Sequence, residues 1–124
     1  SKQFFKEESE MVSLELELTQ TLLHALQGEL MLAYAVGEPE EGSSFAIMVE
    51  ETKQAVEILE TFEANQQVVD VLDKWHNHYR EVADGWRDWV PEFSDEERRE
   101  KMEDYDNRAN EFYQLKEEVE ELLN

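Results

Sequence analysis

Long stretches without glycine or proline are the feature of this sequence that most restricts its fold. The 124 residues include only four glycines and two prolines, and none of these lies between Phe45 and Asp84. Glycine and proline are the residues that most readily interrupt a helix, so long helices are expected. The apolar residues agree, because they recur at spacings of three and four, the repeat of an amphipathic helix.

The first predicted helix extends from about Lys2 or Glu7 to Val36. The alternation "LELEL" in residues 14–18 hints at a strand, but the longer helical repeat around it favours a helix. Residues 37–44, "GEPEEGSS", form the clearest loop of the sequence. A serine at the end of this loop, Ser43 or Ser44, can cap the next helix by accepting a backbone N–H.

The middle of the chain is predicted to be one helix that begins at Phe45. It ends at or before Val90, because Pro91 disfavours helical conformation in the residue that precedes it. We expect this helix to be continuous. The alternative is a break near residues 63–66, with Asn65 as the N-cap of a separate helix.

A third helix follows residues 91–94. Ser94 and Glu97 have the spacing of a capping box, in which each side chain accepts the other residue's backbone N–H. The apolar repeat then continues to the end of the chain. The predicted fold is therefore all-α: a single helical domain over residues 1–124, an elongated antiparallel bundle of three long helices, or four if the middle helix breaks.

Catalytic and metal-binding motifs are missing from the sequence. There is no cysteine, no Gly-x-Ser-x-Gly motif and no glycine-rich phosphate loop. His76 and His78 lie about 200° apart around a helix and cannot share one ion. A calcium loop beginning at Asp104 would need Gly and Glu where Ala109 and Leu115 stand. We therefore expect no enzymatic activity, no metal and no cofactor.

His24 offers one alternative to this view. The segment "TLLHALQGEL" around it resembles the phosphoacceptor helix of phosphotransfer bundles, which implies phosphotransfer through His24. The resemblance covers about ten residues. His24 lies near the apolar repeat of its helix, so the prediction is instead a buried or half-buried core histidine.

The balance of charge is the strongest indication of function. There are 32 acidic residues against 11 lysines and arginines, a net charge of −21. Such a chain would be repelled by DNA, RNA or an anionic membrane surface, so none of these is an expected direct partner. No apolar run is long enough to span a membrane. No basic stretch followed by an apolar one opens the chain, so we expect no leader segment. We expect a cytoplasmic protein with a basic protein partner.

Acidic residues concentrate in two parts of the sequence. Residues 37–64 sum to −7 and residues 92–124 to −8, whereas residues 65–91 sum to −2. Carboxylates three or four residues apart on a helix are about 5–6 Å apart, close to the spacing of phosphates along a nucleic-acid strand. The leading hypothesis is a nucleic-acid mimic that inhibits a DNA- or RNA-binding protein, as phage inhibitors of host defence or transcription do.

Aromatic residues suggest a second binding hypothesis. Trp75, Tyr79, Trp86 and Trp89 follow one another at helical spacing, with Phe93 just beyond. Most of this row is expected in the core, but tryptophan and arginine are enriched at binding hot spots. An adaptor or assembly subunit could dock a partner there, and a homodimer is a further alternative. The predicted partner-binding residues are Glu38, Glu40, Glu41, Glu50, Glu51, Trp86, Arg87, Trp89, Glu117, Glu118 and Glu121.

Overall fold

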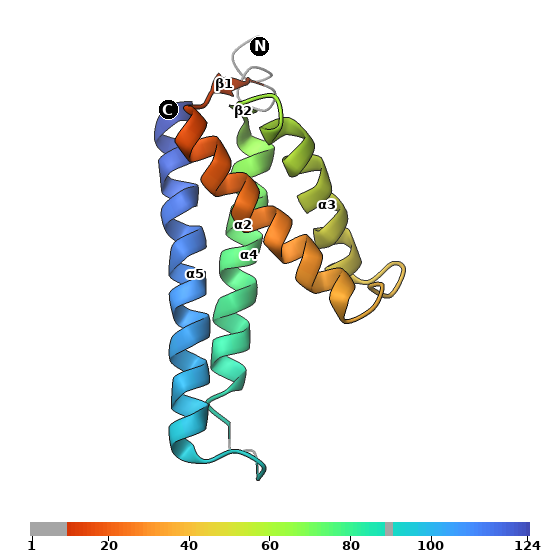
Figure 1. The fold of residues 1–124 in the computed structure, drawn as a ribbon, viewed down its shortest axis with the longest axis vertical. Helices are drawn as coiled ribbons and strands as arrows, with labels where there is room; N and C mark the ends of the chain where they lie inside the picture. Colours follow the sequence, from red (N-terminus) through yellow and green to blue (C-terminus); the bar gives the residue numbers. More distant parts are fainter. Residues whose placement is uncertain (1–9, 89–90) are drawn as a thin grey trace. The chain divides into compact units, whose positions relative to one another are not determined.

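Four helices make up most of the part of the chain that the structure describes, and the predicted all-α class is confirmed (Figure 1). The computed structural model describes residues 10–88 and 91–124. The turns fall where glycine, proline and the caps predict them, over residues 36–43 and 91–94. In order, the elements are β1 (Val12–Ser13), α2 (Leu16–Ala35), α3 (Ser44–Leu59), β2 (Glu63–Ala64), α4 (Gln66–Gly85) and α5 (Asp95–Leu123).

The chain divides into two compact units. One comprises Ser1–Val71 with Val119–Asn124, and the other comprises Leu72–Glu118. The first contains α2, α3 and both short strands, and the second contains most of α4 and α5. The single domain and its elongated form stay predictions.

The first helix begins later than the sequence suggests. The prediction placed residues 10–15 in that helix, and it is wrong there because the backbone of this segment pairs with another strand. Val12 and Ser13 are opposite Ala64 and Glu63 in an antiparallel pair, and the Leu14 N–H donates to the Phe62 carbonyl over 2.8 Å. The prediction for residues 2–9 lies outside the described residues.

The expected continuous middle helix is also wrong, and the four-helix alternative is correct. α3 ends at Leu59, and Phe62 follows in the left-handed conformation with φ of 61°. The Phe62 N–H donates to the Leu59 carbonyl over 2.9 Å, so a residue that is not glycine serves as the turn at the helix end. Asn65 then caps α4 as the alternative predicted, because its side-chain oxygen accepts the Val68 N–H over 3.3 Å.

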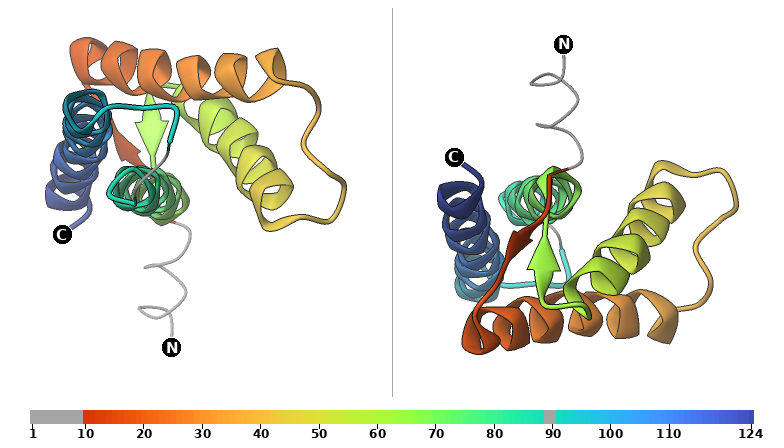
Figure 2. Two further views of the ribbon diagram at one scale, coloured as in Figure 1. Left: turned by 90° about the horizontal axis from the view of Figure 1, so that it is seen from below. Right: turned by 90° about the horizontal axis from the view of Figure 1, so that it is seen from above.

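The α2–α3 hairpin forms the body of the first unit. The two helices are inclined to one another and joined by a wide loop (Figure 2). Their inward residues include Leu22 and Leu26 on α2 and Ala55 and Leu59 on α3, all fully buried. Buried Thr19 satisfies its hydroxyl within its own helix by donating to the Glu15 carbonyl.

α4 and α5 run antiparallel within the second unit. Lys116 pairs with Asp73 at 3.0 Å at one end of the pair of helices. Arg80 pairs with Asp106 at 3.1 Å nearer the other end. Between these ion pairs, the His76 ring N–H donates to the Ala109 carbonyl over 2.9 Å. Together these contacts fix the register of the two helices, and they confirm the predicted antiparallel arrangement.

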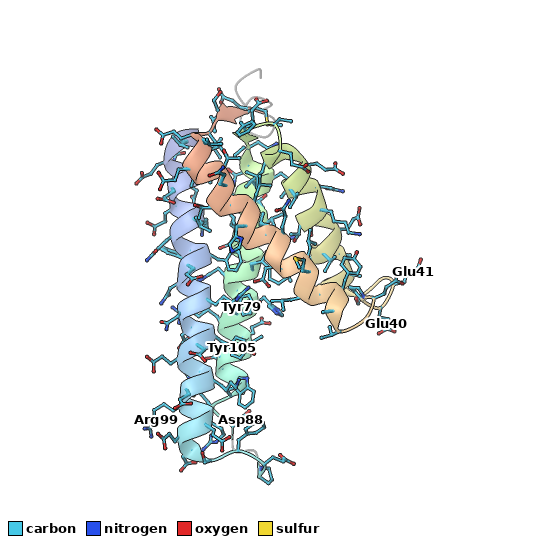
Figure 3. The ribbon with its side chains drawn as sticks, viewed as in Figure 1. Glu40, Glu41, Tyr79, Asp88, Arg99 and Tyr105 are labelled. Carbon is cyan, nitrogen blue, oxygen red and sulfur yellow. The ribbon has the colours of Figure 1, made fainter. Side chains whose placement is uncertain are left out.

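Stacked aromatic rings fill the space between α4 and α5 in this unit. Trp75 and Tyr79 of α4 each lie against Phe112 of α5, with centroids 6.2 Å and 6.1 Å apart. Tyr79 also stacks on Tyr105 at 5.9 Å, and Figure 3 shows these two side chains next to each other. Trp75 and Tyr79 are therefore core, as predicted for most of the aromatic row, whereas Trp86 and Phe93 are half-buried.

The predicted capping box begins α5. The Ser94 backbone N–H donates to the Glu97 carboxylate, and the Glu97 N–H donates to the Ser94 hydroxyl, each over 3.1 Å. The backbone N–H of Ser94, and then its hydroxyl, lower the pKa of the Glu97 carboxyl from its ordinary value. The acidic start of α5 therefore has a structural role of its own.

Replacement of Phe62 tests the cause of the break between α3 and α4. A left-handed residue with a Cβ costs roughly 1–2 kcal/mol relative to glycine, and the Phe62 side chain is 51% exposed. We expect Phe62→Gly to be more stable than Phe62→Ala by about 1 kcal/mol in urea denaturation. Equal stability of the two variants would show that the positive φ angle does not determine the turn.

Candidate partner-binding surfaces

The loop between α2 and α3 has a defined conformation. Gly37 and Gly42 have φ angles of 113° and 81°, which a residue with a Cβ adopts only with strain. Ser43 caps α3 by accepting the Ala46 N–H over 3.0 Å, and its own N–H donates to the Glu40 carbonyl over 3.0 Å. The ends of the loop are therefore held by turns and a cap.

Three predicted acidic residues lie on this loop, and we call Glu38, Glu40 and Glu41 the loop acids. All three are exposed. Figure 3 shows Glu40 and Glu41 on the loop that joins α2 to α3. Among the described residues, none of the three carboxylates is in an ion pair. The loop acids thus present uncompensated negative charge on a loop whose ends are restrained by turns and a cap.

The two predicted acids on α3 differ from the loop acids. Glu50 is exposed but lies 3.8 Å from the Lys53 ammonium, which also lies over the Tyr34 ring, 4.9 Å from its centroid. The pKa of Lys53 is raised chiefly by its hydrogen bond with Tyr34, with a smaller contribution from Glu50. Glu51 is half-buried and already in contact with other groups. Neither residue is as accessible to a basic partner as the loop acids.

Glu117, Glu118 and Glu121 are exposed near the end of α5. At 100° per residue they lie opposite the buried residues of that helix. The same exposed side begins with Glu96, Glu100 and Glu103, which the sequence analysis did not single out. Between the two groups it carries Asn107, Asn110 and Gln114.

The acids of α5 are too sparse to reproduce a DNA duplex. Glu103 and Glu117 are separated by about 21 Å along the axis, at 1.5 Å per residue. The helix carries twelve acidic and five basic residues, a net charge of −7 over its 29 residues. This is about one charge per 6 Å, against one per 1.7 Å along duplex DNA. α5 therefore offers separate acidic groups and not a continuous array with the charge density of duplex DNA.

The residues around Trp86 make more contacts within their own chain than the adaptor hypothesis expects. Trp86 is half-buried and packs edge-on against Phe93, with ring centroids 4.9 Å apart. Arg87 is exposed but pairs with Asp84 at 3.3 Å. The predicted site at Trp89 lies outside the described residues.

Arg98 links the start of α5 to the residues that follow α4. From the first turn of α5 its guanidinium donates to the Arg87 carbonyl over 2.9 Å and to the Asp88 carbonyl over 3.3 Å, and it also pairs with Asp95. These carbonyls lie just beyond the end of α4, where no helical partner remains for them. This role could not be predicted from the sequence, because only folding brings Arg98 to the carbonyls of Arg87 and Asp88.

His24 is exposed on α2, so its expected place in the core is wrong. The helix is rotated so that Leu22 and Leu26 lie inward, and His24 is on the opposite side. Within the described residues, no three histidine, cysteine, aspartate or glutamate side chains are grouped as a metal site would require. In the same part of the chain, no helix combines the length and apolarity needed to cross a bilayer.

Comparisons with protein-family models, with curated proteins and with solved structures find no match for this chain. Its function must therefore be inferred from its own surfaces.

Substitution of Arg98 tests its role in closing the second unit. Lysine keeps the charge but lacks the planar fork that lets one side chain reach two carbonyls and a carboxylate. We expect Arg98→Lys to lower the free energy of unfolding by about 1–2 kcal/mol, as for other hydrogen bonds to charged groups. Arg99→Lys, at the exposed neighbouring residue, is the matched control and should change it by less than about 0.5 kcal/mol. Equal effects would refute this role.

Proposed function

We propose that this protein is a non-enzymatic acidic binding protein that holds a basic, nucleic-acid-binding protein and competes with nucleic acid for it. The observation that carries the proposal is the set of loop acids, Glu38, Glu40 and Glu41. They are exposed and have no basic residue of their own chain in an ion pair among the described residues. An inhibitor of host defence or of transcription would act in this way.

A loop that is partly restrained before binding loses less conformational entropy when a partner binds. Side chains and loops that become ordered on association cost free energy, roughly 0.5–1.5 kcal/mol per immobilised side chain. The Ser43 cap and the hydrogen bond from the Ser43 N–H to the Glu40 carbonyl restrain the end of the loop before any partner arrives. The attraction to a basic surface is then opposed mainly by the ordering of the glutamate side chains.

The field of the whole molecule supports the same partner class. A net charge of −21 attracts basic surfaces over a distance of about 8–10 Å at ordinary salt. Complementary charge accelerates encounter and selects partners more than it raises affinity. The protein would therefore find basic targets quickly, while nucleic acids and acidic proteins are repelled. A cytoplasmic target is part of this proposal.

The adaptor hypothesis has weaker support. Trp86 is already packed on Phe93, and Arg87 is already paired with Asp84. A partner that docked there would have to replace contacts that the protein makes within itself. We therefore place the docking site at the loop acids.

Charge reversal at the loop tests the proposal. Glu38→Lys, Glu40→Lys and Glu41→Lys together should weaken binding to a partner captured from the native cell by about a hundredfold. This estimate assigns about 1 kcal/mol to each exposed charge. The matched control reverses Glu100, Glu103 and Glu111, exposed acids of α5 outside the predicted site, which changes net charge equally. Dissociation constants measured by calorimetry decide the matter. If both variants lose affinity equally, net charge and not the loop is responsible.

The exposure of His24 favours phosphotransfer as a second candidate function, and a direct test separates it from the first. The leading proposal predicts that incubation with a small phosphodonor such as acetyl phosphate leaves the protein unmodified. Mass spectrometry would detect an adduct of one phosphoryl group. An acid-labile adduct that is lost in His24→Ala would establish phosphotransfer and overturn the leading proposal.

A further inference from the structure

The exposed side of α2 differs in composition from the rest of the protein. Charged residues make up 35% of the chain, yet residues 18–36 include one charged side chain, Glu29. Glu29 is buried, with 2% of its surface exposed. The side of α2 that faces solvent therefore carries no aspartate, glutamate, lysine or arginine over about five turns of helix.

We call this surface the outward face of α2 and define it by His24, Gln27, Met31, Leu32 and Ala35. All five residues are exposed, and they lie opposite Leu22, Leu26 and Ala33, which are buried. The face becomes apolar toward the end of the helix, where Met31 is 74% and Leu32 is 54% exposed. Such exposed apolar groups beside polar ones mark interaction surfaces.

Gly28 lies at the centre of this face. A glycine inside a helix costs roughly 1 kcal/mol relative to alanine. A Cβ added at Gly28 would meet no atom within 4 Å, so packing within the described residues does not require glycine there. The absence of a side chain leaves space for another backbone to approach α2 closely.

Acidic residues flank the outward face at both ends. Glu15 and Glu17 are exposed where α2 begins, and the loop acids follow its last turn. From Glu17 to Ala35, the last residue of α2, the helix rises about 27 Å along its axis, and Glu38 lies three residues beyond. The complementary surface is thus about 20 residues of helix with an uncharged, partly apolar face and a positive charge at each end.

We propose that the outward face of α2 binds an α-helix of the basic partner, with small or apolar residues along one side and lysine or arginine at both ends. The inference rests on the proposed function for the charge of the partner, and it adds the shape of the contact. A helix suits this face because its ridges pack into the grooves of another helix. Methionine is a frequent residue of surfaces that bind amphipathic helices.

A second copy of this chain fits the face less well. In a parallel pair of α2 helices, Glu17 and the loop acids would each face their own copies. In an antiparallel pair, Glu17 would face the loop acids of the other copy. Both arrangements bring carboxylates together at the two ends, whereas a helix with basic ends meets opposite charge at each.

The test uses a synthetic peptide of about 20 residues that forms an amphipathic helix, with alanine and leucine on one side and three lysines at each end. The full-length protein is titrated with this peptide and with a control peptide in which glutamate replaces lysine. We expect only the lysine peptide to bind. Met31→Gln with Leu32→Gln should weaken that binding at least tenfold without a change in charge. Ile47→Gln, at an exposed apolar residue of α3, is the matched control and should change it less than twofold.

Further measurements separate the failure of this inference from the failure of the proposed function. Circular dichroism and urea midpoints verify that each variant is folded. If the peptide binds the Met31→Gln, Leu32→Gln variant as it binds the unchanged protein, the α2 inference is wrong. The proposed function still stands in that case if reversal of the loop acids weakens the natural partner. A dimer in sedimentation experiments that is lost in this variant would make a second copy the occupant and would also overturn the inference.

Discussion

Self-repulsion among carboxylates is the constraint on which the rest of this structure depends. With 32 acidic and 11 basic residues, the fold cannot pair most of its acids. Three of its bases lie where helices meet or end: Lys116 and Arg80 join α4 to α5, and Arg98 closes the turn between them. Exposed pairs of this kind stabilise by about 0–1 kcal/mol each, so the stacked aromatic rings contribute more.

This use of the bases determines where uncompensated charge remains. The loop between α2 and α3 contains three acids and no base, and Lys53, the base nearest in sequence, is held by Tyr34 and Glu50. The side of α2 next to that loop has no exposed formal charge over residues 18–36. An acidic loop beside an uncharged helix face is therefore a consequence of how the charges are distributed. It is also the combination that a basic, amphipathic partner would recognise.

Much of this fold could be predicted from the sequence, and the errors have identifiable causes. Helical repeats, the Ser94–Glu97 capping box and the glycine-bounded loop were correct because each depends on local chemistry. The break after Leu59 was misjudged because Phe62 adopts a conformation expected of glycine. The first helix was extended too far because the pairing of Val12 with Ala64 is a contact between distant segments.

The candidate site was predicted less completely than the fold. The loop acids were found because a glycine-rich loop is exposed whatever surrounds it. Exposure of Glu50 and Glu51 depends on their neighbours on α2 and α3, and the sequence did not show that Lys53 pairs with Glu50. His24 was misplaced although the apolar repeat itself was right: Leu22 and Leu26 are buried, and His24, two residues from each, lies about 200° around the helix from both.

Competition with nucleic acid tests the central claim most directly. The complex of this protein with its captured partner is titrated with duplex DNA and with RNA, and the dissociation constant is measured from about 0.05 to 0.2 M salt. The account predicts displacement by at least one nucleic acid and affinity that falls steeply with salt, because the contacts between exposed charges are screened. No displacement by either nucleic acid, together with affinity that does not change with salt, would contradict it.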